Sequence, residues 1–144
     1  MTTPLLRSKV KKSQTWNNES VFASPEEFDV EVNSLVESLA TIKNFQGRLG
    51  DGPDTFFKAM NIVDGISQRA AKVQVYATMS STVDTGNQQG AAMNGKAMSA
   101  LAQVAAATSF VDPELLSIGE EKLRQWLKDE PRMSLYEHYL NDLF

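Results

Sequence analysis

The spacing of large apolar residues constrains the fold most strongly, because it follows a helical period over long stretches. After the sequence SPEE at 24–27, large apolar side chains recur every three or four residues, at Phe28, Val32, Leu35, Leu39 and Ile42. Such spacing places them on one face of an α-helix. No segment alternates polar and apolar residues with period two over the length of a strand. The pattern therefore predicts an all-α chain of about five to six helices in an antiparallel bundle-like array.

The first helix carries both a start and a stop signal. Ser24 is a favourable N-cap, Pro25 suits the first helical position, and Glu27 completes a capping box. The sequence GRLGDGP at 47–53 is typical of a helix end followed by a turn.

Two longer helices are expected next. The second should run from Pro53 to about Ser81 and the third from about Asn87 to Val111, with the turn sequence VDTGN between them. Gly65 lies inside the second helix, where it permits either close helix packing or a small kink. The third helix is rich in alanine and glycine. Because small side chains let helices approach closely, we expect it to be a central helix that others surround.

Short motifs predict the remaining helices. Asp112, followed by a proline, is predicted to cap a helix at a tight corner. The pairs Ser117–Glu120 and Ser134–Glu137 match the capping box, and each should begin one further helix.

The chain is expected to consist of an extended arm, residues 1–23, and a helical domain, residues 24–144. The aromatic residues Trp16 and Phe22 should hold the arm against the domain, since each can bury a large apolar area. The last residues, YLNDLF, continue an amphipathic pattern with no glycine, asparagine or proline to stop it. We therefore expect the natural polypeptide to continue C-terminally.

Composition argues against several classes of partner. Acidic residues exceed basic ones by 18 to 14, and the formal net charge is −4. Phosphate binding requires clustered Lys and Arg, so nucleic acid is not expected as a partner. The most apolar run is shorter than the roughly 20 residues of a membrane-spanning helix, so no membrane partner is expected. The chain has no cysteine, which fits a cytoplasmic location.

The residues offer no recognisable catalytic, cofactor-binding or metal site, and we expect none in this chain. The motif His-Glu-x-x-His, which supplies two zinc ligands and a general base, is absent, and His138 is the single histidine. The nucleophile motif Gly-x-Ser-x-Gly is absent as well.

Two sets of side chains could mark a binding surface. One is a set of methionines, which form either an adaptable apolar face for peptides or ordinary core: Met60, Met79, Met93 and Met98. The other is a set of tyrosines, which either donate hydrogen bonds to a peptide backbone or lie between core and water: Tyr76, Tyr136 and Tyr139.

Several stretches, taken in order, resemble the N-terminal region of oligoendopeptidase F, a zinc metallopeptidase family similar to thimet oligopeptidase. They are TWNNESVF at 15–22, SPEEF at 24–28, FQGRLG at 45–50, VYATMSSTVDTGN at 75–87, SFVDPELLS at 109–117 and YEHYLNDL at 136–143. The family commonly has Asp-Leu-Ser within the first stretch, and Asn17, Asn18 and Glu19 depart from that pattern.

The resemblance implies a non-catalytic, helical N-terminal part of a zinc-dependent enzyme that hydrolyses short peptides. In that family such helices form one wall of a deep cleft and limit access to it. Zinc is held by His-Glu-x-x-His and a later glutamate in a C-terminal catalytic domain. The implied partners are therefore that domain and short peptides, and the implied cofactor is zinc outside this chain. The alternative is a free-standing helical interaction module without enzymatic activity.

Overall fold

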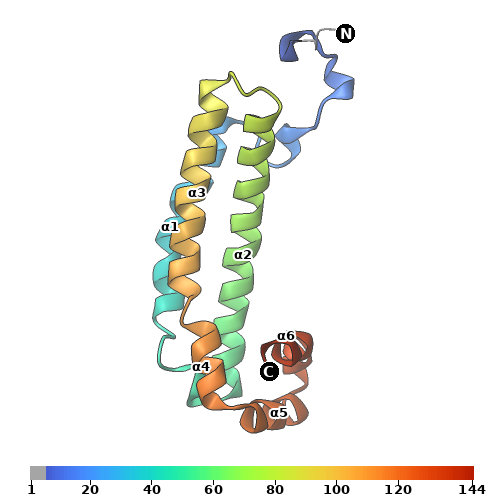
Figure 1. The fold of residues 1–144 in the computed structure, drawn as a ribbon. Helices are drawn as coiled ribbons and strands as arrows, with labels where there is room; N and C mark the ends of the chain where they lie inside the picture. Colours follow the sequence, from blue (N-terminus) through green and yellow to red (C-terminus); the bar gives the residue numbers. More distant parts are fainter. Residues whose placement is uncertain (1–5) are drawn as a thin grey trace. The chain divides into compact units, whose positions relative to one another are not determined.

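The computed structural model describes residues 6–144, and over this range it contains helices and no strand. The α-helices are α1 (Pro25–Lys43), α2 (Pro53–Thr82), α3 (Gln88–Thr108), α4 (Val111–Ile118), α5 (Glu120–Asp129) and α6 (Glu137–Leu143) (Figure 1). Short 3-10 helices are η1 (Arg7–Lys9), η2 (Lys12–Gln14), η3 (Asn18–Ser20), η4 (Leu49–Asp51) and η5 (Pro131–Tyr136). The predicted all-α fold is confirmed.

The chain divides into two compact units, and neither is continuous in sequence. The first unit combines the described residues up to Val36 with Arg69–Ala102, and the second combines Glu37–Gln68 with Gln103–Phe144. Each of the helices α1, α2 and α3 contributes residues to both units.

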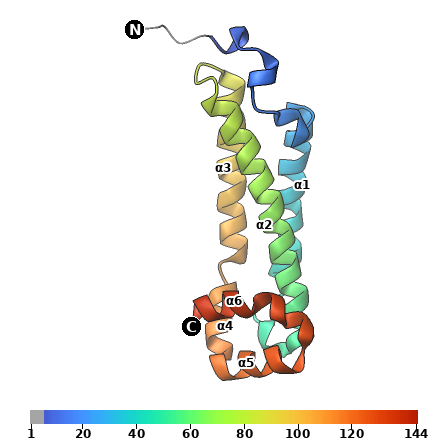
Figure 2. The ribbon, with the colours of Figure 1, turned by 90° about the vertical axis from the view of Figure 1, so that its right-hand side faces the viewer.

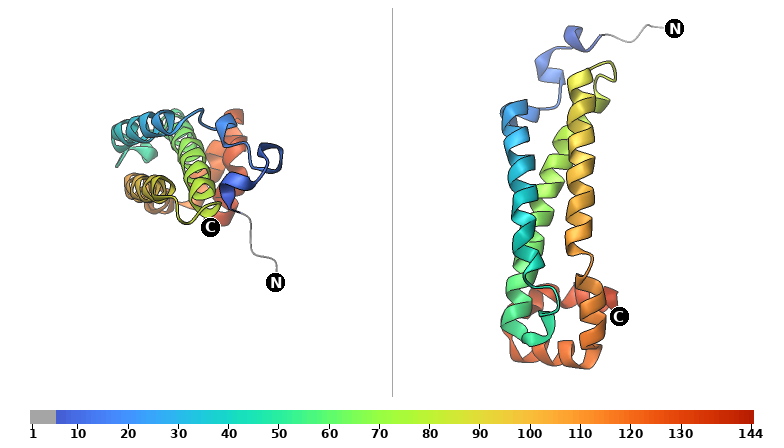
Figure 3. Two further views of the ribbon diagram at one scale, coloured as in Figure 1. Left: turned by 90° about the horizontal axis from the view of Figure 1, so that it is seen from above. Right: turned by 90° about the vertical axis from the view of Figure 1, so that its left-hand side faces the viewer.

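In the first unit, the parts of α1 and α3 run in one direction and the part of α2 runs in the other (Figure 3). Three aromatic rings pack together in this unit: Phe28 stacks on Tyr76 with centroids 5.4 Å apart, and Phe22 meets Tyr76 edge-on at 5.2 Å. Phe22 therefore holds the N-terminal arm, as expected. Residues 6–23 are not extended throughout, because η1, η2 and η3 interrupt them; residues 1–5 of the predicted arm lie outside the described residues.

The predicted start of α1 is present. The Ser24 hydroxyl oxygen accepts a hydrogen bond from the Glu27 backbone N–H at 3.4 Å. The Glu27 carboxylate in turn accepts the backbone N–H of Ala23 at 3.0 Å. These two bonds satisfy N–H groups that a helix start would otherwise leave without partners.

The junction of α2 and α3 brings two backbones unusually close. Asn87 caps α3, because its side-chain oxygen accepts the N–H groups of Gln89 at 3.0 Å and Gly90 at 3.2 Å. A Cβ atom placed on Gly90 would lie 2.8 Å from the Ser80 carbonyl oxygen. Close packing therefore depends on Gly90. Of the two possibilities considered for Gly65, close packing is absent, since a Cβ there would meet nothing within 4 Å.

The expectation that α3 is a central helix is wrong. One face is buried, at Met93, Ala97, Ala100, Val104 and Ala107. The other face is exposed and is also rich in alanine, at Ala91, Ala92, Ala102, Ala105 and Ala106. Alanine favours a helix on exposed and buried faces alike, so its abundance indicated helix but not burial.

In the second unit, Glu114 of α4 fastens the loop that follows α1. Its carboxylate accepts hydrogen bonds from the backbone N–H of Gly47 and, at 3.3 Å, from that of Leu49. Leu49 is fully buried. The loop is thereby held by a charge-assisted contact at a point where its own backbone has no helical partner.

All three helix starts predicted after residue 110 need correction. The helix α4 begins at Val111, so Asp112 lies in its first turn and makes no cap. Ser117 lies inside α4, which ends at Ile118. Gly119, with φ +90°, follows and leads directly into α5 (Figure 2). Ser134 lies inside η5, whose start is capped by the Glu130 side chain. Both capping boxes match in sequence but form no cap. Gly119, with its positive φ, separates α4 from α5, and the Glu130 side chain caps η5.

Candidate functional site

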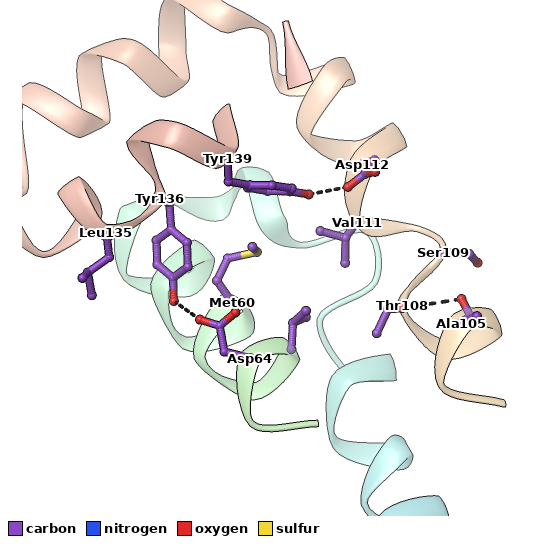
Figure 4. A pocket seen from close by; sticks show the side chains of 11 residues that line it. Met60, Asp64, Ala105, Thr108, Ser109, Val111, Asp112, Leu135, Tyr136 and Tyr139 are labelled. Carbon is purple, nitrogen blue, oxygen red and sulfur yellow. Dashed lines mark hydrogen bonds between the residues drawn. The ribbon is translucent and has the colours of Figure 1, made fainter. Parts of the chain in front are cut away.

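A pocket of about 670 Å³ lies in the second unit, between α2, the α3–α4 corner and the segment from η5 to α6 (Figure 4). Its lining residues are Met60, Val63, Asp64, Ala105, Thr108, Ser109, Val111, Asp112, Leu135, Tyr136 and Tyr139. Volumes of this size are typical of ligand-binding pockets.

Tyr136, the last residue of η5, provides one side of the pocket. Its hydroxyl donates to the Asp64 carboxylate at 3.0 Å, and the Asn61 side-chain oxygen lies 3.4 Å away. The ring packs edge-on against Phe56 at 5.6 Å, and only 5% of the residue is exposed. Burial, followed by the hydrogen bond to Asp64, raises the pKa of Tyr136 to about 12. The hydroxyl therefore stays protonated at neutral pH and keeps donating to the carboxylate.

Tyr139, the third residue of α6, repeats this arrangement on the other side. Its hydroxyl donates to the Asp112 carboxylate (Figure 4). Burial, and then the contact with Asp112, raises the pKa of Tyr139 above its ordinary value. Asp112 lies in the first turn of α4, where the helix dipole favours a negative charge. The pocket thus presents two aspartates, each oriented by a tyrosine.

The rest of the lining is mainly apolar. Met60 and Val111 are buried, while Leu135 stands at the rim with 75% of its surface exposed. Among the lining residues, Asp64 and Asp112 are the charged ones, and none is Lys, Arg or His. The chemistry available is therefore apolar contact together with carboxylate acceptors, which suits binding.

The family resemblance implies zinc outside this chain, and the described residues offer no alternative site that fits it. Within residues 6–144, no group of three His, Cys, Asp or Glu side chains is placed to hold a metal ion. The His138 side chain is 88% exposed, and its Nδ1 lies 3.6 Å from the Asp142 carboxylate.

The pocket contains some of the tyrosines and methionines that the sequence singled out as a candidate binding surface. Tyr136, Tyr139 and Met60 line the pocket, whereas Tyr76 is buried in the aromatic core of the first unit. The four methionines do not form one face, since Met60 and Met93 are buried and Met98 is exposed.

Sequence reasoning missed both aspartates as site residues. Asp64 follows Met60 by four positions, so the two share a face of α2. A charged residue on the same face as a buried methionine is a signal that could have identified Asp64.

Comparison with known proteins supports the relationship that the sequence suggested. A family model described as "Oligopeptidase F" matches residues 114–144. The chain is 34% identical over 95% of its length to oligopeptidase PepF of Bacillus subtilis. It is 29% identical over 96% of its length to the group B oligopeptidase PepB of Streptococcus agalactiae. It spans 20% and 23% of these two relatives, respectively.

A solved structure shows the same fold. The crystal structure of oligoendopeptidase-F from Enterococcus faecium matches 83% of this chain with a TM-score of 0.77 and 30% sequence identity, and the match covers 24% of that protein. The helical fold and these matches show that the chain resembles one domain of the oligoendopeptidase F proteins. The predicted resemblance to the N-terminal domain of oligoendopeptidase F is confirmed.

Within residues 6–144, no helix is both long enough and apolar enough to span a membrane.

Proposed function

We propose that this chain is the non-catalytic N-terminal part of a zinc-dependent oligoendopeptidase that hydrolyses short peptides in the cytoplasm. The observation that carries the proposal is the 34% identity to PepF over 95% of the chain, although the chain spans only 20% of that relative. On this proposal, zinc and the residues that activate water belong to a separate C-terminal catalytic domain, which is the chain's first partner.

The proposed role is steric. A helical wall beside the catalytic domain would admit a flexible peptide and exclude a folded protein, and it would limit the access of bulk water to the reaction. Rigid helices suit such a role, and residues 6–144 are mostly helical.

A chimera tests this function. The matching N-terminal fifth of Bacillus subtilis PepF is replaced by residues 1–144, and a second variant simply lacks that fifth. Circular dichroism first establishes that both proteins are folded, and zinc analysis establishes that both contain the metal. We expect the chimera to cleave a fluorogenic short peptide while sparing casein, and the deletion variant to lose either activity or this selectivity. A deletion variant that matches the chimera in both assays would contradict the proposed role.

The isolated chain provides the second test. It should show no peptide cleavage in the presence of zinc. Chelator-sensitive cleavage by the purified 144-residue chain would contradict the assignment of the chemistry to another domain.

A further inference from the structure

The pocket in the second unit carries two exposed carboxylates that take part in no ion pair of the described residues. Asp64 and Asp112 each accept one tyrosine hydroxyl, at Tyr136 and Tyr139, and neither forms an ion pair within residues 6–144. An ionised carboxylate has about four acceptor sites, so most of this capacity remains available.

The tyrosines also orient these carboxylates. The Tyr136 ring is fixed by edge-on contacts with both Phe56 and Phe57, and Tyr139 is half-buried. A carboxylate held in this way loses little conformational freedom when it binds a cation, which favours binding.

The walls between the carboxylates fit an aliphatic chain. Met60, Val63 and Val111 supply apolar surface, and Leu135 adds more at the rim. Lys and Arg side chains combine an apolar stem with a charged head, and they bury the stem along apolar surface. A pocket with apolar walls and two carboxylates therefore complements a basic side chain better than a neutral or acidic one.

We propose that this pocket receives a lysine or arginine side chain from the catalytic part of the same enzyme. The inference rests on the proposed function, which supplies the partner, because the chain spans only 20% and 23% of the two relatives. The negative charge of the two aspartates is complementary to the positive charge of a lysine or arginine side chain. The pocket is thus a docking point that helps to fix this domain against the rest of the protein.

Small probes test the chemistry on the 144-residue chain by itself. The NMR signals of the Met60 methyl group and of the two pocket tyrosines are followed during titration with n-butylguanidinium, 1-pentanol or pentanoate. We expect the cation to bind at least about tenfold more tightly than pentanoate. The double variant Asp64→Asn, Asp112→Asn should reduce that preference to less than about twofold, with an unchanged circular dichroism spectrum.

A charge-matched control keeps the test specific. Glu37 and Glu121 are exposed carboxylates of the second unit outside this pocket, so the variant Glu37→Gln, Glu121→Gln changes the net charge equally. It should retain the preference for the cation. Equal binding of the cation and pentanoate to the unsubstituted chain would overturn the assignment of the pocket, and so would loss of the preference in the control variant.

The chimera with PepF identifies the partner. The double substitution Asp64→Asn, Asp112→Asn is made in the chimera and in the 144-residue chain. It should lower the thermal-inactivation midpoint of the chimera by more than the melting temperature of the 144-residue chain. Equal shifts of the two temperatures would overturn the proposal that the basic side chain comes from the catalytic part. So would a result in which the substitution changes only the cleavage of peptides that carry a basic residue. Peptidase activity of the unsubstituted chimera reports on the proposed function separately, so failure of one proposal is distinguishable from failure of the other.

Discussion

Two glycines of α3 should respond to alanine in opposite ways. Gly90 and Gly95 lie in the same helix and the same unit. At Gly95 a Cβ atom would meet nothing within 4 Å. At Gly90 it would lie 2.8 Å from the Ser80 carbonyl oxygen and 3.2 Å from the Ser81 Cα, which are backbone atoms that cannot rotate away.

The magnitudes follow from these surroundings. Alanine is favoured over glycine inside a helix by about 0.8 kcal/mol, so Gly95→Ala should stabilise the protein by nearly that amount. Forcing extra volume into a tight contact costs about 1–3 kcal/mol, which outweighs the smaller helix-propensity gain at the third residue of α3. Gly90→Ala should therefore destabilise by roughly 1–2 kcal/mol.

Thermal unfolding followed by far-UV circular dichroism measures both changes. For a chain of this length 1 kcal/mol corresponds to about 3 °C, so Gly95→Ala should raise the melting temperature by about 2 °C and Gly90→Ala should lower it by about 3–6 °C. Gly65→Ala is a second control, because its surroundings are equally open and it lies in the other unit. If Gly90→Ala melted at or above the temperature of Gly95→Ala, the claim that Gly90 permits the close approach of α2 and α3 would be refuted.

Further substitutions test the other contacts. Glu114→Ala removes the acceptor for two loop N–H groups and should cost about 2 kcal/mol in urea denaturation, whereas Glu114→Gln should restore part of the loss. The pKa of Tyr136 is about 12 in the fold and about 10 when unfolded, so its contribution is complete below pH 10 and is lost between pH 10 and pH 12. Tyr136→Phe should therefore flatten the fall of stability over that interval, and an unchanged alkaline profile would contradict the raised pKa of Tyr136. Asn87→Ala should cost about 1 kcal/mol through loss of the α3 cap, while Ser117→Ala, inside α4, should leave the melting temperature unchanged.

The sequence predicted the helices well where pattern and end signals agreed. The helix α1 carries both an apolar stripe and the Ser24 capping box, and both are present in the structure. The sequence predicted helix starts poorly where a four-residue capping motif was the only signal. At Ser117 and Ser134 the motif was matched, but Gly119 and the Glu130 side chain define the helix ends there.

The pocket could be only half predicted, for a physical reason. Tyr136 and Tyr139 stand out as aromatic residues with a polar end, but their partners lie 72 and 27 positions earlier in the chain. Contacts over such distances depend on how the helices pack, and local spacing contains no signal for them. The buried and exposed faces of α3 could not be separated either, because alanine occurs on both.

The interleaving of the two units in sequence has a consequence for how such a domain can change in evolution. The chain alternates between units, with boundaries after Val36, Gln68 and Ala102, and each of these positions lies within a helix. A single genetic crossover therefore cannot exchange one unit for a homologous one, and any junction near these boundaries interrupts α1, α2 or α3. We expect viable recombinants between relatives to inherit residues 25–108 as one block, with exchange concentrated in the segments before α1 and after α3.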